Sequence, residues 1–476
     1  MSLLFRREGT NLSLPLAPLI VLTSGYTLAL FAVTLWHYLA WRSTAWDLGF
    51  YAQALWLISQ GHLQAYSTLA QRPLLADSGQ YTTYLLAPLY RLGGVPLLLL
   101  LQATALGSGL LFLRLLLNRL RIAPPLAWGL CLTYAAYPAV LGANLFDFHP
   151  DVFAVPALFG VIWALETERW TWYYIALALA LFTKDMVATA AWALAVPVAM
   201  RRRYLSAALT AAFSLAVLWF TLRVVMPGMT HQAVMNQWAA YYSRWGPTPM
   251  AGLSNLFLHP WYLFAWMADL RAWLYLGTLV LPLLVLPLLI GGSRSGYLWP
   301  ALSLIEVNLL SSFPAQTAPF DQYSLFAIPF LFVSTAYGLA RPLPFAKDLP
   351  SLQRLVATVS LLVVFGWEAH THYFDIPQDQ MALAAAASRI PSRGTVVSQN
   401  FILPHLADRP VLYDLNEIRS RLPSGAWILL DRSFSTGNNP PAEVRRYLHG
   451  LADSPKEQLI FHQDGIYLFH SSPQGR

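Results

Sequence analysis

Long apolar stretches, separated by short segments that carry most of the charge, dominate this chain. A charge-free window of about 19 residues is long enough to cross a bilayer as a helix. Windows of that kind include Val95–Leu113, Tyr204–Leu222, Ala272–Ser293 and Gln322–Ala340. The pattern therefore predicts an α-helical polytopic membrane protein.

Along the whole sequence, the apolar pattern predicts about eleven transmembrane helices, of which the fourth to sixth are short. The predicted spans are 15–40, 94–118, 125–143, 152–166, 170–185, 187–200, 204–226, 271–292, 296–312, 323–340 and 352–370. We expect residues 1–370 to form this transmembrane domain. Two further helices, at 46–60 and 80–92, are predicted to lie on the outer membrane surface because their apolar residues recur at helical spacing.

The pattern changes after residue 370, where short apolar runs alternate with helical segments. Strands are predicted at 395–398, 410–413 and 427–431, and a closing hairpin at 458–462 and 465–469. Helices are predicted at 381–390 and 441–451. Alternating strands and helices indicate a small α/β domain with a partly parallel sheet over 371–476. No glycine-rich phosphate loop occurs in it, so we predict no nucleotide site there.

Composition supports a membrane protein, because 57% of the residues are hydrophobic and only 11% are charged. The net charge of +7 does not indicate a nucleic-acid partner, since the basic residues gather at the ends of the predicted spans. With an odd number of spans, these clusters all fall on one side, which the positive-inside rule makes cytoplasmic. The C-terminal domain is then extracytoplasmic. The clustered residues are Arg6, Arg7, Arg114, Arg119, Arg121, Arg201, Arg202, Arg203, Arg341 and Lys347.

Polar residues appear at membrane level in four stretches: 46–51, 146–151, 183–185 and 320–323. A charged side chain at the centre of a bilayer costs about 2.5–3.5 kcal/mol on insertion scales, so such groups persist mainly where they pair or act. The predicted topology places all four stretches at the outer face. We therefore expect one polar site there. The loop 228–270 on the same face is rich in aromatic residues, which is typical of the membrane interface.

Asp47 is the candidate catalytic residue. Its position ahead of the helix predicted at 46–60 fits an N-cap, and an aspartate at the membrane surface can also take a proton from an acceptor hydroxyl. Lys184 and Asp185 interrupt an apolar run. Adjacent residues on a helix do not face each other, so each is expected to have another partner. Lys184 and Arg244 are candidate phosphate ligands.

Asp147, His149 and Asp151 lie within five residues of one another. Two carboxylates and an imidazole at this spacing are able to hold a hard cation, Mg²⁺ or Mn²⁺. The alternative is a metal-free interfacial turn, in which Pro150 ends one helix and Asp151 caps the next. No cofactor follows from the sequence with certainty. The single cysteine, Cys131, excludes an intrachain disulfide.

Several motifs resemble a bacterial family of polytopic membrane proteins that is filed as a domain of unknown function. The motifs are Trp46-Asp-Leu-Gly-Phe-Tyr-Ala-Gln-Ala-Leu-Trp56, Leu86-Ala-Pro-Leu-Tyr90, Gly142-Ala-Asn-Leu-Phe-Asp-Phe-His-Pro150, Lys184-Asp185, Val397-Ser-Gln-Asn400 and Leu403-Pro-His-Leu-Ala-Asp-Arg409. That family in turn resembles the GT-C glycosyltransferases. These are multi-spanning enzymes with an outer-face active site and an acidic residue in the first loop, which transfer sugars from polyprenyl-phosphate carriers.

The resemblance implies that Asp47 takes the place of the first-loop catalytic acid. The sequence departs from the family at Gln80 and Gln322, where other members often carry histidine. Glutamine cannot act as a base and is a poor metal ligand, so either the histidines are not essential or this member has altered or lost activity. The candidate substrate-binding residues, besides Lys184 and Arg244, are Gln80, His149, Asp185, Gln322 and Tyr323.

The sequence therefore predicts an inner-membrane glycosyltransferase with a polyprenyl-phosphate sugar donor. Its acceptor, whether glycan, lipid or protein, stays open. A transporter or flippase of a lipid-linked substrate is the second hypothesis, and it would place polar groups through the depth of the bundle with an internal repeat. A catalytically inactive scaffold is the third, and the two glutamines favour it.

Overall fold

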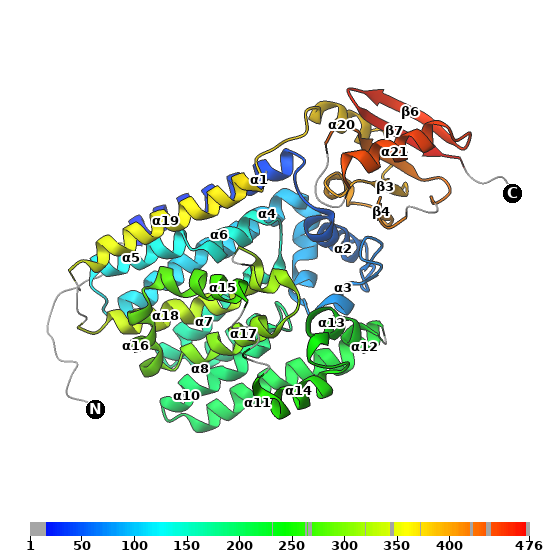
Figure 1. Ribbon diagram of the computed structural model, residues 1–476. Coiled ribbons are helices and arrows are strands. Elements are labelled where there is room, and N and C mark those ends of the chain that lie inside the picture. The colour runs from blue at the N-terminus through cyan, green and yellow to red at the C-terminus, as the bar shows by residue number, and fades with distance from the viewer. Residues whose placement is uncertain are drawn as a thin grey trace.

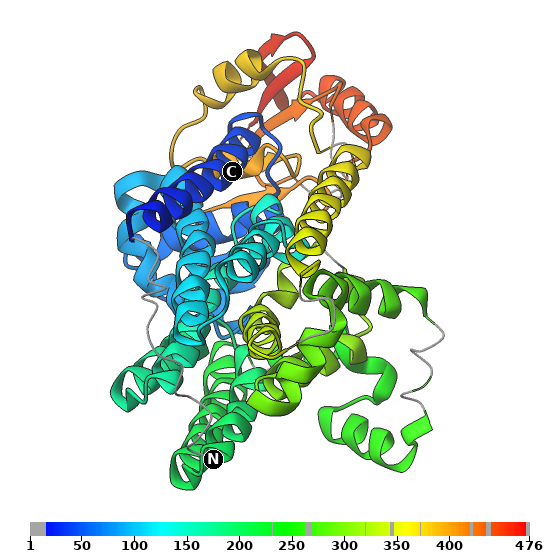
Figure 2. The same cartoon turned by 90° about the vertical axis from the view of Figure 1, so that its left-hand side faces the viewer.

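The computed structural model describes residues 16–472, except 231, 262–263, 265–268, 319, 343–346, 372, 419–421 and 435–438. Long helices pack side by side, and a small sheet domain lies at one end of them, next to the blue N-terminal helices (Figure 1; Figure 2). Arg6 and Arg7, which entered the topology prediction, fall outside the described residues.

The helical part contains α1–α19 and several one-turn helices. The α-helices are α1 (Leu16–Leu39), α2 (Phe50–Ser59), α3 (Leu74–Asp77), α4 (Thr82–Arg119), α5 (Pro124–Ala135), α6 (Pro138–Leu145), α7 (Ala154–Glu166), α8 (Trp170–Leu181), α9 (Val187–Ala191), α10 (Ala195–Met200), α11 (Tyr204–Phe220), α12 (Met226–Met229), α13 (Ala233–Tyr242), α14 (Pro249–Leu258), α15 (Leu270–Val280), α16 (Val285–Ser295), α17 (Leu298–Leu310), α18 (Ile328–Leu339) and α19 (Leu349–His370). The described residues of this part also form two π-helices, η1 (Ala45–Gly49) and η4 (Thr221–Val225). They form the 3₁₀ turns η2 (Pro150–Phe153), η3 (Trp192–Leu194), η5 (Ser243–Trp245), η7 (Leu281–Leu283), η8 (Pro314–Thr317) and η9 (Gln322–Ala327). A short antiparallel pair, β1 (Tyr66–Ser67) and β2 (Arg72–Pro73), lies between α2 and α3.

Each predicted span contains helix, but the spans differ in length. Among the described residues, six helices are long and apolar enough to cross a membrane, or seven if the bent pair 270–295 is one span. The helices at 170–181, 187–200 and 298–310 are apolar but shorter. At 1.5 Å per residue, α8 is about 18 Å long, against roughly 30 Å of hydrocarbon. The structure thus supports a multi-spanning membrane protein, and the count of eleven stays a prediction.

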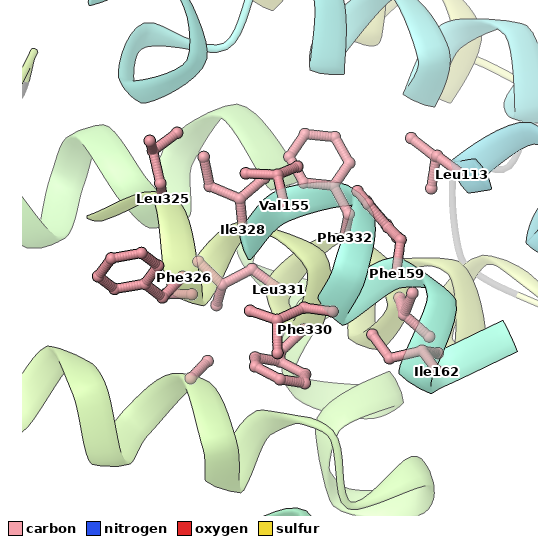
Figure 3. Packing of buried hydrophobic residues seen from close by; sticks show 14 of the residues in the cluster. Leu113, Val155, Phe159, Ile162, Leu325, Phe326, Ile328, Phe330, Leu331 and Phe332 are labelled. Atoms are coloured by element: carbon pink, nitrogen blue, oxygen red, sulfur yellow. The ribbon is translucent and has the colours of Figure 1, made fainter. Parts of the chain in front are cut away.

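The helical core forms around α18, which is apolar on every side. A helix that is apolar all round is found buried on every side, because any exposed face would leave apolar side chains in water. Phe332 of α18 lies beside Val155 and Phe159 of α7, whereas Phe330 points to the other side of α18 (Figure 3). All four side chains are fully buried. This rigid core supports the loops at one end of α7.

The predicted surface helix at 80–92 is the first part of α4. Gly94 breaks the helix with φ 57°, a left-handed conformation that glycine adopts without steric cost. Leu85, Leu89 and Leu92 are exposed at helical spacing before this break. An exposed stripe of leucines suits a segment that lies against the membrane surface.

The C-terminal domain contains a five-stranded sheet of order β4-β3-β5-β7-β6 with two helices. The elements are α20 (Gln380–Ala387), β3 (Val396–Ser398), η10 (Leu403–Leu406), β4 (Leu412–Asp414), β5 (Trp427–Asp431), α21 (Pro441–Ala452), β6 (Glu457–Gln463) and β7 (Ile466–Ser471). β3 pairs in parallel with β4 and β5, and β7 is antiparallel to β5 and β6. The predicted partly parallel α/β sheet is therefore confirmed. The domain boundary at residue 370, where α19 ends, stays a prediction.

One face of this sheet packs on the helical part. Successive residues of a strand point to opposite faces. Val396 and Leu429 belong to the cluster that contains Leu55 of α2, whereas Val397 and Ile428 pack against α21. The helix predicted at 46–60 forms, and α2 is buried along nearly its whole length between α4, its neighbours in the first loop and this cluster. Its place at the outer membrane surface stays a prediction.

Candidate functional site

A cavity of about 650 Å³, here called the main cavity, lies where the four polar stretches meet. Its walls are largely apolar and aromatic. Four aromatic residues of the loop 228–270 line it: Trp238, Tyr241, Tyr242 and Trp245. The residues used below that line it are Trp46, Asp47, Tyr51, Arg72, Asp77, Ser78, His149, Lys184, Asp185, Met186, Trp238, Tyr241, Trp245, Gln316, Gln322 and Tyr323.

Asp47 lies in the π-helix η1, one turn before α2. One carboxylate oxygen accepts a hydrogen bond from the Thr44 hydroxyl at 3.0 Å, and the other is 3.0 Å from Nε2 of His149. The Asp47 side chain is 23% exposed, whereas the His149 side chain is 2% exposed. Asp47 does not cap α2, which continues directly from η1. Its carboxylate is therefore fixed in direction and still open to the cavity.

His149 is held from three sides. The side-chain oxygen of Gln102 accepts a hydrogen bond from its backbone amide at 2.9 Å, and its ring stacks on Phe146. Burial lowers the pKa of His149, but the hydrogen bond and negative charge of Asp47 outweigh burial and raise the pKa above its usual value. Nδ1 has no hydrogen-bond partner among the described residues. The imidazole thus balances the charge of Asp47 and orients it.

Lys184 has the separate partner expected from the sequence. Its ammonium donates to Asp151 at 2.7 Å and lies 5.2 Å from the centre of the Tyr323 ring. The other oxygen of Asp151 accepts a hydrogen bond from the side-chain amide of Gln80, which also donates to the Tyr51 hydroxyl. Gln80 is fully buried and does not line the main cavity. It therefore supports the site from behind rather than contacting a ligand.

Asp185 fixes the turn at 78–80. Its carboxylate accepts hydrogen bonds from the Ser78 hydroxyl at 2.7 Å and the Gly79 amide at 3.2 Å. A methyl group at Gly79 would come within 2.6 Å of the Thr221 side chain, so the turn packs closely against η4. Although Asp185 lines the main cavity, two of its hydrogen-bonding positions are already used inside the protein.

The three candidate metal ligands do not converge. The Asp147 carboxylate accepts a hydrogen bond from the Thr44 amide, and the Asp151 carboxylate accepts one from Lys184. The His149 ring is hydrogen-bonded to Asp47. No group of three or more His, Cys, Asp or Glu side chains among the described residues is placed to hold a metal ion. The predicted ligand set therefore does not fit a shared Mg²⁺ or Mn²⁺, because each member has its own partner.

Arg244 is placed differently from the prediction. Its guanidinium donates to the carbonyl oxygens of Leu309 and Leu310 and lies over the Trp245 ring, and it does not line the main cavity. The last carbonyl groups of a helix lack internal partners, and Arg244 satisfies two of them at the end of α17. Arg72 lines the main cavity instead, in an ion pair with Asp77.

Gln322 and Gln316 carry side-chain oxygens that are buried and have no hydrogen-bond partner among the described residues. Both residues line the main cavity. A buried acceptor without a partner is costly, at roughly 1–3 kcal/mol, and indicates a place for a donor from a ligand or from water.

Asp321, next to Gln322, is a further carboxyl close to Asp47 and His149. Burial is the main cause that raises its pKa to about 7, while the charge of His149 opposes this effect. Asp321 therefore holds its proton more readily than an ordinary aspartate.

A second cavity of about 630 Å³ adjoins the main cavity, and we call it the side cavity. The two share Ala70, Arg72, Asp77 and Tyr241. Gln64, Gln71, Thr230 and Gln232 make the side cavity more polar than the main cavity. The Arg72–Asp77 ion pair thus stands between a polar space and an apolar one.

This fold and site define a class: a multi-spanning membrane protein whose buried polar site opens into an apolar cavity, with a small α/β domain over its first loop. Residues 37–461 match the family model described as "Predicted membrane protein (DUF2079)", and the chain belongs to that family. No curated protein matches the chain.

The fold is similar to that of ArnT from Cupriavidus metallidurans. The crystal structure of ArnT bound to undecaprenyl phosphate has a TM-score of 0.54 and 14% identity, covering 97% of this chain and 100% of that one. The apo structure of ArnT has a TM-score of 0.54 and 13% sequence identity, and the match covers 95% of this chain and 99% of that one. At this identity the likeness concerns the fold.

Six residues predicted for the site line the main cavity: Asp47, His149, Lys184, Asp185, Gln322 and Tyr323. The sequence did not predict the roles of Arg72, Gln102 and Thr44. The signal for Arg72 was its isolated charge in the first predicted outer loop. The role of Gln102 had no such signal, because a single glutamine in an apolar helix commonly satisfies a neighbouring backbone.

Proposed function

We propose that this protein is an integral-membrane glycosyltransferase that moves a sugar from a polyprenyl-phosphate donor to an acceptor at the outer face of the membrane. The observation that carries the proposal is the direction of Asp47. Its carboxylate is oriented by His149 and Thr44 and opens into an apolar cavity that also contains Lys184. The fold similarity to ArnT, a protein crystallised with undecaprenyl phosphate, supports the same class of ligand.

In this proposal, the apolar wall of the main cavity receives the isoprenoid chain, and the phosphate lies between Lys184 and Arg72. A point charge and a guanidinium are both suited to phosphate. The side chains of Gln316 and Gln322 accept hydrogen bonds from sugar hydroxyls, which supplies the donors that their buried oxygens lack. Tyr241 and Trp238 offer aromatic surface to the sugar ring.

Asp47 acts as the general base. It takes the proton of the acceptor hydroxyl while the acceptor oxygen attacks the anomeric carbon, and the bond from that carbon to the phosphate oxygen breaks. The polyprenyl phosphate leaves with the bonding electrons, and Lys184 stabilises its charge. His149 holds the Asp47 carboxylate during the transfer. The polar side cavity beside Arg72 is the route for a hydrophilic acceptor. No step requires a metal at Asp147, His149 and Asp151.

Ligand binding gives the first test. Undecaprenyl phosphate should raise the thermal unfolding midpoint of the purified protein in detergent, because a ligand that binds only the folded state stabilises it. Undecaprenol, which lacks the phosphate, is the matched control and should give a clearly smaller shift. Equal shifts with both lipids would contradict a phosphate site.

Transfer gives the second test. Membranes that contain the protein should move radiolabelled sugar from polyprenyl-phosphate donors into acceptor fractions, and membranes without it should not. Binding of undecaprenyl phosphate without transfer from any donor would favour the flippase hypothesis. Absence of both would favour an inactive scaffold.

A further inference from the structure

The turn that carries Asp47 is held at its start by two side chains from distant parts of the chain. The carboxylate of Asp147 accepts a hydrogen bond from the Thr44 amide at 2.6 Å. The side-chain oxygen of Asn400 accepts one from the Ala45 amide at 3.1 Å. The first amides of a helix have no partner within it. These two residues therefore cap η1 from outside.

Asn400 is itself fixed within the sheet domain. It follows β3 at the carboxyl end of the parallel strands and is 6% exposed. Its backbone amide donates to the side-chain oxygen of Asn439 at 3.2 Å, and its side-chain amide donates to Asp414 at 3.4 Å. The oxygen that reaches Ala45 thus has a defined position.

Asp147 is fixed in a different way. It has φ 69°, a left-handed conformation that aspartate adopts more readily than most residues. Its backbone carbonyl accepts a hydrogen bond from Gln102, and its pKa lies below the usual range. Burial opposes ionisation, but the nearby charge of His37 and the hydrogen bond from the Thr44 amide outweigh burial. The helical part thus holds one amide of the turn, and the sheet domain holds the next.

Other contacts attach the sheet domain without touching this turn. The Tyr90 hydroxyl donates to Asp408, and the side chain of Gln53 donates to the carbonyl of Arg409. His405 stacks on Tyr38 and Trp41. Attachment of the domain therefore does not depend on Asn400, and the bond from Asn400 to Ala45 is available for another role.

We propose that Asn400 is a positioning residue for Asp47, so that the sheet domain completes the active site of the membrane-embedded part. This inference rests on the proposed function for its catalytic consequence, but not for the hydrogen bond itself. Asp47 is two residues from the amide that Asn400 binds. A displacement of about 1 Å in a catalytic group can cost roughly 10²-fold in rate. Asn400 acts through the turn and touches neither substrate.

The experiment uses the full chain in lipid nanodiscs and compares wild type with Asn400→Ala. Hydrogen exchange should become faster in the peptide covering residues 44–49 and stay unchanged in the strands of the sheet domain. In the transfer assay, kcat should fall by roughly 10- to 100-fold with an unchanged KM for the donor. A purely structural role would instead loosen the sheet domain as well.

Tyr90→Phe is the matched control, because it removes one hydrogen bond of domain attachment away from the turn. It should leave both exchange at 44–49 and kcat within about twofold of wild type, as expected for a contact that does not order the reacting group. The double variant Asn400→Asp/Asp414→Asn keeps an acceptor oxygen for the Ala45 amide and a donor between the two side chains, so it should retain the protection of 44–49. If Asn400→Ala loosens the whole sheet domain, this variant tests by itself whether the bond to the Ala45 amide orders the turn.

Wild-type exchange at 44–49 in a folded Asn400→Ala variant would overturn the inference, as would lost protection with an undiminished kcat. The same holds if Asn400→Asp/Asp414→Asn folds and still loses the protection. If wild type transfers no sugar, the proposed function fails separately, and the exchange measurements alone decide whether Asn400 orders the turn.

Discussion

At the scale of single residues, three neighbouring aspartates differ in what they bind, and the partner decides what each can do. Asp151 is fully buried against Lys184, and Asp147 is buried against a backbone amide. Their lone pairs are engaged within the protein. Asp47 keeps a carboxylate that reaches the main cavity. It is therefore the aspartate suited to receive a proton from a bound hydroxyl.

Asp47→Asn tests this assignment because it keeps the size of the side chain and removes its basicity. Transfer should fall by about 10²–10⁴-fold, the usual contribution of a general base, while expression and folding persist. The assay is transfer of labelled sugar in membranes. Asp464→Asn, a change of the same kind at an exposed hairpin turn, should leave the rate unchanged. Full activity of Asp47→Asn would remove Asp47 from the mechanism.

The raised pKa of His149 predicts a pH dependence of stability. A group that binds its proton more tightly in the folded state stabilises that state fully below its unfolded pKa, near 6.5, and less as pH rises through the folded pKa. The unfolding midpoint of wild type relative to His149→Gln should therefore be highest at acid pH and decline toward alkaline pH. Thermal unfolding of both proteins from about pH 5.5 to pH 9 tests this. A difference that grows with pH would contradict the assigned direction.

At the scale of elements, the Lys184–Asp151 pair joins the turn after α8 to η2, across 33 residues. Removing one partner of a buried ion pair leaves the other charge unpaired and typically costs about 3–5 kcal/mol. Lys184→Met should therefore destabilise strongly in denaturant unfolding. The double variant Lys184→Met/Asp151→Asn should recover most of that loss, although transfer stays low. Additive losses would show that the pair does not couple the two elements.

The turn at 78–80 packs against η4 through Gly79. A methyl group there meets the Thr221 side-chain methyl, and overpacking of this kind costs about 1–3 kcal/mol. Gly79→Ala should lower the unfolding midpoint, and Thr221→Ser should restore part of it, because serine lacks that methyl but keeps the hydroxyl near Tyr81. No rescue by Thr221→Ser would place the strain elsewhere.

The local apolar pattern predicted the positions of helices and strands better than it predicted what they pack against. The strand at 427–431 was recognised from its own apolar residues and found at those residues. The full burial of α2 was not predicted, in part because apolar strand residues of the same cluster lie more than 300 residues further on. The same distance hides the bond from Asn400 to Ala45. The bonds of Arg244 to the carbonyl oxygens of Leu309 and Leu310 could not be predicted either, because a charge alone does not reveal whether carbonyl groups or a ligand satisfy it.

At the scale of the whole molecule, the polar groups separate into two ends. Glu166, at the far end of α7 from Asp151, bonds Arg201, Tyr297 and Tyr337. The 13 residues of α7 separate the ends by about 20 Å. Arg201 belongs to one of the clusters used to predict the cytoplasmic side. A polar site at one end and arginines at the other fit the proposal of an enzyme that works at one membrane face.

This separation leads to the prediction of topology. If the arginine end is cytoplasmic, the sheet domain and the main cavity face outward, where a polyprenyl-linked sugar meets an extracytoplasmic acceptor. A reporter enzyme that folds only outside the cytoplasm should be active when fused after Arg476. The same reporter fused after Arg203, within the arginine cluster, should be inactive and serves as the control. The reverse result would invert the protein, and it would move the proposed transfer to the cytoplasmic face while leaving the geometry of Asp47 and Lys184 intact.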